Sequence, residues 1–329
     1  MVLYDGPVTD IDPATPSPSE AVVEPVEPRR AAIDEFTAVS RYFPRRGRTT
    51  VGAWCFLDYY GPDDVDGAPG MRVGPHPHTG LQTVTWLLQG EVVHRDSLGS
   101  VQPIVPGQLN LMTAGAGIAH AELSPDPHPR WLHGVQLWVA LPEAHRQVPP
   151  AFEHHPDLPV ADLGGAQATV LVGDLAGARS PATTFSPLLG ADVRVPGTGR
   201  APGTGGATVP LDPDFEHALL VVDGTVAVEG RPLPTGACVY LGRGRATLPV
   251  AGDPAGRFLL LGGQPFTEPL IMWWNFVGRT TEDIAEARAD WESQSGGASR
   301  PGNRFGQVAG HPAGRVPAPP LPPGRLKPR

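Results

Sequence analysis

The chain has 329 residues, which is enough for two domains of ordinary size, and its 41 glycines and 41 prolines predict many turns and short strands. Its net charge of −9 argues against unaided binding to nucleic acid or to an anionic membrane, since both require a basic face. The two cysteines, Cys55 and Cys238, exclude a disulfide framework and a zinc–thiolate site and favour a reducing compartment.

Residues 1–30 are acidic, rich in proline and without hydrophobic periodicity. Such a segment buries too little apolar area to offset the entropy lost on ordering, so we expect a disordered acidic tail. The start of the chain lacks a basic region followed by an apolar run, and no apolar stretch reaches the roughly 18 residues of a membrane helix. We therefore expect a cytoplasmic protein that does not bind membranes.

Two short motifs carry the chemistry. His76 and His78 are separated by one residue, and so are His120 and Glu122. Residues two apart on a strand share one face, so neighbouring strands of a barrel could direct all four side chains at one metal ion. An isolated His-x-His pair is more often structural, but two such pairs, with strand-like sequence between them, favour a site. Three imidazoles and a carboxylate suit a divalent first-row transition metal.

The strand that follows the first pair sets a second expectation. If it continues from His76 without a bulge, Gln82 and Trp86 face the same way as the histidines. We then expect Gln82 to line the cavity as a polar group and Trp86 to supply an aromatic wall. His94 is out of phase with both pairs, so we interpret it as structural.

The second half of the chain repeats the strand pattern of the first without its metal motifs. Residues 219–228 parallel residues 87–93, but the position equivalent to His78 is Asp212. We predict a second barrel that binds no metal.

A helix is expected after this barrel. Thr280 can cap it, and Ile284, Ala287 and Trp291 form one apolar face at helical spacing. Residues 293–329 are basic and rich in proline and glycine, and we expect a second disordered tail there.

These motifs resemble those of the pirin family, within the cupin superfamily. The residues that carry the resemblance are Gly74–Leu88, Gly90–Gly99, Met112–Glu122 and Glu268–Thr280. The resemblance covers roughly residues 35–292 and implies an all-β fold of two tandem cupin (jelly-roll-like) β-barrels with a short C-terminal helix. It also implies one metal site, with the four residues of the two motifs, His76, His78, His120 and Glu122, as ligands.

Combined with composition, this predicts four segments: an acidic tail over 1–30, a metal-binding barrel over 31–160, a metal-free barrel ending in the helix over 161–292, and a basic tail over 293–329. Many pirins carry glutamate where this chain has Gln82. An amide cannot take up a proton at neutral pH, so metal binding should survive while any role as a base is lost.

The resemblance implies a metal-dependent dioxygenase of the quercetin 2,3-dioxygenase type, acting on a flavonol-like aromatic and dioxygen, with Glu122 as the catalytic base. We expect iron(II), with manganese, nickel, cobalt, copper and zinc as alternatives. A non-enzymatic, metal- or redox-dependent regulatory protein that binds a transcription factor or a metabolic enzyme is the competing prediction. A metal that only stabilises the fold is less favoured, because closed structural zinc sites are usually rich in cysteine. We expect a monomer.

Overall fold

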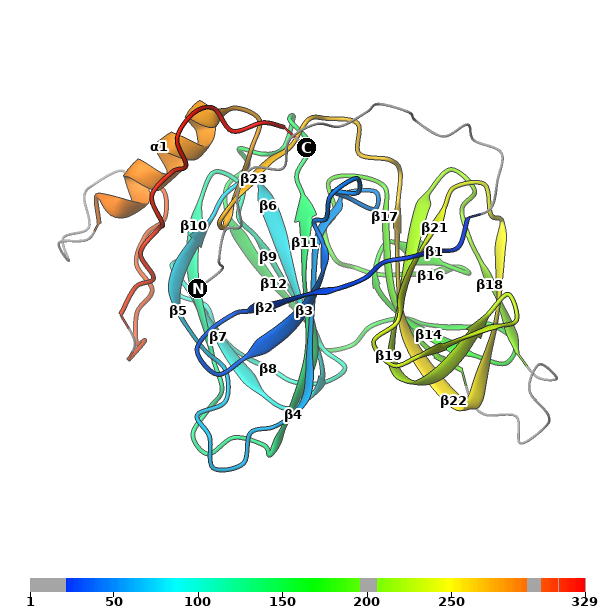
Figure 1. The fold of residues 1–329 in the computed structure, drawn as a ribbon. Helices are drawn as coiled ribbons and strands as arrows, with labels where there is room; N and C mark the ends of the chain where they lie inside the picture. The colour runs from blue at the N-terminus through cyan, green and yellow to red at the C-terminus, as the bar shows by residue number, and fades with distance from the viewer. Residues whose placement is uncertain (1–21, 196–205, 295–302, 313, 329) are drawn as a thin grey trace.

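The computed structural model describes residues 22–195, 206–294, 303–312 and 314–328. These residues form two β-barrels side by side and one helix near the C-terminus (Figure 1), which confirms the predicted all-β class with two tandem barrels. Among them, no helix is both long enough and apolar enough to cross a membrane.

The first barrel consists of a seven-stranded and a four-stranded sheet. The strand orders are β12-β9-β6-β11-β4-β3-β2 and β5-β10-β7-β8, with all pairs antiparallel. The strands are β2 (Arg29–Ala32), β3 (Ala38–Phe43), β4 (Trp54–Asp64), β5 (Arg72–His78), β6 (Leu81–Gln89), β7 (Val92–Asp96), β8 (Val101–Ile104), β9 (Leu109–Thr113), β10 (Ile118–Leu123), β11 (Trp131–Ala140) and β12 (Ala151–His155).

The expectation of one continuous strand from His76 to Leu88 is wrong. The chain leaves the four-stranded sheet after His78 and enters the seven-stranded sheet at Leu81. Gly80 makes this change possible, because its φ of +70° is unfavourable for other residues and a Cβ there would lie 2.2 Å from the Val277 carbonyl oxygen. The side chains of β6 therefore do not follow the phase of the two histidines.

The second barrel is built from one large sheet of nine strands. Its main order is β1-β21-β19-β22-β17-β14-β13, with β18 on β22 and β20 on β19, and a small hairpin of β15 and β16 lies beside it. The strands are β1 (Glu24–Pro25), β13 (Val160–Asp162), β14 (Gln167–Val172), β15 (Asp174–Leu175), β16 (Ala178–Arg179), β17 (Leu188–Val195), β18 (Ala207–Pro210), β19 (Glu216–Val228), β20 (Arg231–Pro234), β21 (Cys238–Gly242) and β22 (Thr247–Gly263).

The two ends of the chain each cross to the opposite barrel. At the N-terminal end, β1 pairs with β21 of the second barrel, while β2 joins the first barrel. The structure differs here from the expected disordered tail, because pairing with distant strands satisfies a backbone that has no local hydrophobic pattern. The remainder of that predicted tail, residues 1–21, lies outside the described residues.

At the C-terminal end, β23 (Ile271–Trp273), β24 (Phe276–Gly278) and α1 (Thr281–Glu292) return to the first barrel. The backbone of Val277 donates a hydrogen bond to the Thr79 carbonyl at 3.0 Å. Thr280 caps α1 through a capping box, and Ile284, Ala287 and Trp291 are its buried residues, which confirms the predicted helix.

The segment after α1 also packs on the first barrel in its described parts, residues 303–312 and 314–328 (Figure 1, red). Phe305 is fully buried, and its carbonyl accepts a hydrogen bond from Ala119 at 3.0 Å. Val316 donates to the Pro75 carbonyl at 2.7 Å. The structure differs here from the expected disordered tail, because Phe305 and Ala318 are buried in one cluster with Ala119 of β10 and with apolar residues of β23, β24 and α1.

Trp86 belongs to the interface between the barrels. Its ring is 1% exposed, and its Nε1 donates a hydrogen bond to Asp192 Oδ2 on β17 at 2.9 Å. The same carboxylate pairs with Arg257 of β22. The tryptophan therefore joins the barrels through a hydrogen bond to a buried charge.

We predict that Trp86→Phe lowers the free energy of unfolding by about 1.5–3 kcal/mol, the value of a hydrogen bond to a charged group. Urea denaturation followed by circular dichroism measures the change. Trp131→Phe is the matched control, because Trp131 is 42% exposed and its replacement should change stability by less than about 0.5 kcal/mol. Equal effects of the two substitutions would contradict the prediction.

Candidate metal centre

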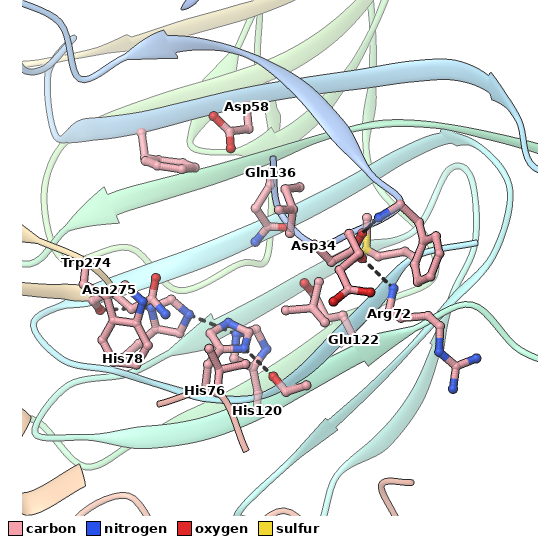
Figure 2. A pocket seen from close by; sticks show the side chains of 18 of the residues that line it. Asp34, Asp58, Arg72, His76, His78, His120, Glu122, Gln136, Trp274 and Asn275 are labelled. Atoms are coloured by element: carbon pink, nitrogen blue, oxygen red, sulfur yellow. Dashed lines mark hydrogen bonds between the residues drawn. The ribbon is translucent and has the colours of Figure 1, made fainter. Parts of the chain in front are cut away.

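The pairing of β5 with β10 brings the predicted histidines together. His120 lies directly opposite His76, and Ile118 lies opposite His78, in an antiparallel register. One ring nitrogen from each of the three histidines lies within 4.8 Å of the others. All three rings are buried at one end of the cavity drawn in Figure 2.

The spacing of the ring nitrogens fits a metal ion. His78 Nε2 and His120 Nε2 are 3.0 Å apart. Two nitrogens at about 2.1 Å from one ion and at right angles to each other are separated by about 3.0 Å. The two imidazoles therefore stand at the separation of adjacent ligands in an octahedral site.

Backbone carbonyls orient the two histidines of β5. His76 Nδ1 lies 2.9 Å from the Gly74 carbonyl oxygen, and His78 Nδ1 lies 3.1 Å from that of Asn275. A carbonyl only accepts, so each Nδ1 carries the proton and donates it. The lone pair of each ring is then on Nε2, as a metal site requires.

A relay of side chains orients His120. Its Nδ1 lies 3.4 Å from His94 Nδ1, and His94 Nε2 lies 3.1 Å from Asp96 Oδ2. Although burial alone would raise the pKa of Asp96, hydrogen bonds from His94 and Ser100 lower it, so this group is a carboxylate. The Asp96 carboxylate accepts a hydrogen bond from the N–H at His94 Nε2. His94 Nδ1 then accepts a hydrogen bond from the N–H at His120 Nδ1, and the lone pair of His120 is on Nε2.

Sequence phase alone missed this role of His94. His94 lies on β7, directly opposite Glu122 of β10, so it approaches the site from a third strand. The signal available in the sequence was the spacing of His94 and Asp96, which are themselves two residues apart and share one face.

Glu122 belongs to a second group of possible ligands that shares His120 with the first. One of its carboxylate oxygens, a nitrogen of His120 and a nitrogen of His94 lie within 4.8 Å of one another, and Oε1 lies 3.0 Å from the Thr85 hydroxyl. Burial raises the pKa of this carboxyl. A bulge between His120 and Glu122 in the pairing with β5 shifts the carboxylate relative to the histidine pair.

A cavity of about 400 Å³ extends from the histidines into the first barrel. All four predicted ligands line it, together with the aromatic side chains of Phe36, Phe56, Trp138 and Trp274. Gln82 and Trp86 are not among the residues that line it. Gln82 is instead fully buried, where its Nε2 donates to Thr113 Oγ1 at 2.9 Å, so both expectations for β6 are corrected.

The turn between β23 and β24 closes one side of the cavity. Trp274 and Asn275 form a two-residue connection, and Trp274 has a φ of +52°, a left-handed conformation that costs a bulky residue about 1–2 kcal/mol. The turn directs the Asn275 carbonyl at His78 and places the Trp274 side chain on the cavity. A strained residue beside the histidines is typical of a functional site.

Two tandem β-barrels, the first of which holds a cluster of histidines from adjacent strands, define a bicupin. The sequence matches the family model of pirin over residues 36–139 and that of the pirin C-terminal cupin domain over residues 201–296. The chain belongs to the pirin family.

The similarity to individual pirins extends over most of the chain. A Pseudomonas aeruginosa protein described as a candidate quercetin 2,3-dioxygenase is 47% identical over 307 residues, which cover 93% of each chain. A pirin-like protein of Caulobacter vibrioides is 35% identical over 80% of this chain and 91% of its own. The crystal structure of a quercetin 2,3-dioxygenase from Acinetobacter baumannii superposes with a TM-score of 0.85 at 40% identity, covering 93% of this chain and 97% of that one.

We predict that His94→Phe weakens zinc binding by about 10–100-fold, the usual effect of removing a partner that orients a ligand. Phenylalanine keeps the ring stacked on Phe152 but cannot accept the proton of His120. Competition with a chromophoric chelator measures the affinity, and circular dichroism checks the fold. His128→Phe, at a partly exposed loop position outside the cavity, is the control. Unchanged affinity in a folded His94→Phe protein would show that the relay has no such role.

The metal-free protein should also be acid-sensitive. Burial lowers the pKa of His76 from 6.5 to about 4, and it lowers those of His78 and His120 as well. At His76 the unfolded chain therefore binds a proton below about pH 6.5 that the folded chain does not bind until the pH nears 4. This stability is fully present above about pH 6.5 and is lost on acidification towards pH 4, by about 1.4 kcal/mol per pH unit. His78 and His120 act in the same direction.

Urea unfolding of the metal-free protein at about pH 7.5 and about pH 5 measures this loss. His76→Gln removes one of the three titrating groups, so the variant should lose less stability than the wild type between these pH values. Equal losses would rule out His76 as a contributor.

Proposed function

We propose that the chain is a metal-dependent dioxygenase of the quercetin 2,3-dioxygenase type, which acts on a flavonol-like aromatic enol and dioxygen. The observation that carries the proposal is that three buried histidines and four aromatic side chains line the same cavity of about 400 Å³. Its size and composition suit one planar aromatic ligand held against the histidines. Relatives that match most of the chain carry the name of this activity.

The residues present fit one divalent transition metal. His76, His78, His120 and Glu122 would hold it, all within the barrel that we assign to residues 31–160, while the barrel over 161–292 holds none. Three imidazoles and a carboxylate suit iron(II), with manganese, nickel, cobalt, copper and zinc as alternatives. The ion would supply Lewis acidity that lowers the pKa of the enol hydroxyl of the substrate.

Once it has loosened from the metal, Glu122 would take the enol proton. Burial raises the pKa of its carboxyl, which makes the carboxylate a stronger base than one in water. The Thr85 hydroxyl, 3.0 Å from Oε1, holds one carboxylate oxygen and leaves the other for the proton. The aromatic side chains of the cavity keep water from the enolate, which takes up dioxygen and opens its ring with loss of carbon monoxide.

We predict that metal-depleted protein, reconstituted anaerobically with one metal at a time and then exposed to oxygen, consumes a flavonol with at least one of the six metals. The loss of flavonol absorbance measures the rate. His76→Ala should reduce the rate more than about 100-fold, since even changes around the ligands cost 10–100-fold. His128→Ala, at a partly exposed position outside the cavity, should retain the rate of the wild type.

Bound metal without turnover in any of the six forms would contradict the dioxygenase. It would favour the competing prediction of a regulatory protein, whose partner would then be a transcription factor or a metabolic enzyme. Turnover that persists in His76→Ala would place the chemistry elsewhere in the molecule.

A further inference from the structure

One row of polar side chains crosses the inner face of the seven-stranded sheet. Thr85 on β6 lies opposite Gln136 on β11, Gln136 lies opposite Asp58 on β4, and Asp58 lies opposite Arg41 on β3. Residues directly opposite each other on neighbouring strands share one face of the sheet. Gln136, Asp58 and Arg41 line the cavity, and Figure 2 shows Gln136 between Asp58 and the histidines.

An aromatic row runs beside the polar one. Trp138 and Phe56 are opposite each other, with ring centroids 4.0 Å apart and an interplanar angle of 12°. The Arg41 guanidinium lies 4.4 Å from the Phe56 ring centroid, and the His78 ring lies 5.2 Å from that of Trp138. One wall of the cavity thus runs without a break from Arg41, through two aromatic rings, to the histidines.

The hydrogen bonds of Gln136 leave part of its amide unused. Thr85 Oγ1 lies 3.0 Å from both Glu122 Oε1 and Gln136 Oε1. A hydroxyl has one proton, so with Glu122 ionised it donates to the carboxylate and accepts from the Gln136 amide, whose Nε2 then turns towards Thr85. The amide oxygen and the second N–H of Gln136 are left for the cavity.

Arg41 has spare donors as well. Its Nε and Nη2 donate to the two oxygens of Asp58 at 2.7 and 2.6 Å, and both side chains are almost fully buried. This ion pair does not use Nη1. A buried ion pair contributes little net stability, so stability alone does not explain why Arg41 and Asp58 lie on the cavity wall. Their position favours a role in ligand binding.

We propose that Gln136 and Arg41 form a recognition site for hydroxyl groups on a planar aromatic ligand that lies against Trp138 and Phe56. A phenolic hydroxyl both donates and accepts, which matches the free oxygen and N–H of Gln136, and its oxygen accepts from Arg41. The inference rests on the proposed function for the class of ligand only. It adds that the end of the ligand remote from the histidines is selected for its hydroxyl groups.

The test is equilibrium binding rather than turnover. The full chain is loaded with zinc, kept anaerobic and titrated with quercetin, which carries hydroxyls on its outer rings, or with 3-hydroxyflavone, which has the same skeleton and only the enol hydroxyl. Quenching of tryptophan fluorescence reports binding, because Trp138 and Trp274 line the cavity. We expect the wild type to bind quercetin at least about tenfold more tightly.

In Gln136→Leu, leucine has a similar volume to glutamine but no amide. The affinities for quercetin and 3-hydroxyflavone should then differ by less than about threefold. The affinity for 3-hydroxyflavone itself should change by less than about threefold. Arg41→Lys keeps the charge beside Asp58 but loses the planar donors, and it should also reduce the preference. Gln102→Leu, on β8 outside the cavity, should retain the preference of the wild type.

A preference that survives in Gln136→Leu, or equal binding of both ligands by the wild type, would overturn the inference. A preference that depends on Gln136 in a protein without turnover would support it while the dioxygenase proposal fails. Turnover of flavonols without any preference for quercetin would support the dioxygenase proposal and overturn the inference about Gln136 and Arg41.

Discussion

The antiparallel register between β5 and β10 is the constraint on which the site depends. It places His120 opposite His76 and Ile118 opposite His78, and in this buried pocket Nε2 of His78 stands 3.0 Å from Nε2 of His120. In each ring the N–H at Nδ1 donates a hydrogen bond to another acceptor, so the two Nε2 lone pairs face each other. Facing lone pairs repel each other unless a cation lies between them. A cation bound between the two rings would satisfy both lone pairs, which supports the proposal of a metal site.

The rest of the chain serves to hold that arrangement. The second barrel contributes through the strand that leaves it, since β23 and β24 bring the Asn275 carbonyl to His78. The described part of the segment after α1 then reaches both β5 and β10, where Val316 donates to the Pro75 carbonyl of β5 and the Phe305 carbonyl accepts from Ala119 of β10. The second barrel thus supports the candidate metal site, because it anchors the segment whose Asn275 carbonyl orients the His78 ring.

The sequence predicted the features that depend on local periodicity. The two i, i+2 pairs, the repeated barrel and the capped helix follow from spacing, and the structure confirms the barrels, the grouping of the three histidines and the helix. The predictions for Gln82 and Trp86 were wrong because the chain passes at Gly80 from the four-stranded sheet into the seven-stranded sheet. The spacing of His94 and Asp96 indicates that these two residues share a face, but the partnership of His94 with His120 and the docking of the terminal segments depend on residues far apart in the sequence.

Charge gives a further reason to connect the metal centre with an enol substrate. The three histidines are neutral at pH 7, because burial lowers their pKa values, and Arg41 is balanced by Asp58. With Glu122 ionised, the ligand set carries a single negative charge, so a divalent ion leaves the site with a single positive charge inside a poorly polarisable interior. A neutral ligand would leave that charge uncompensated, whereas a ligand that ionises to a monoanion neutralises it. In the proposed reaction the same balance would favour proton transfer to Glu122, because the enolate would then replace the carboxylate as the compensating charge.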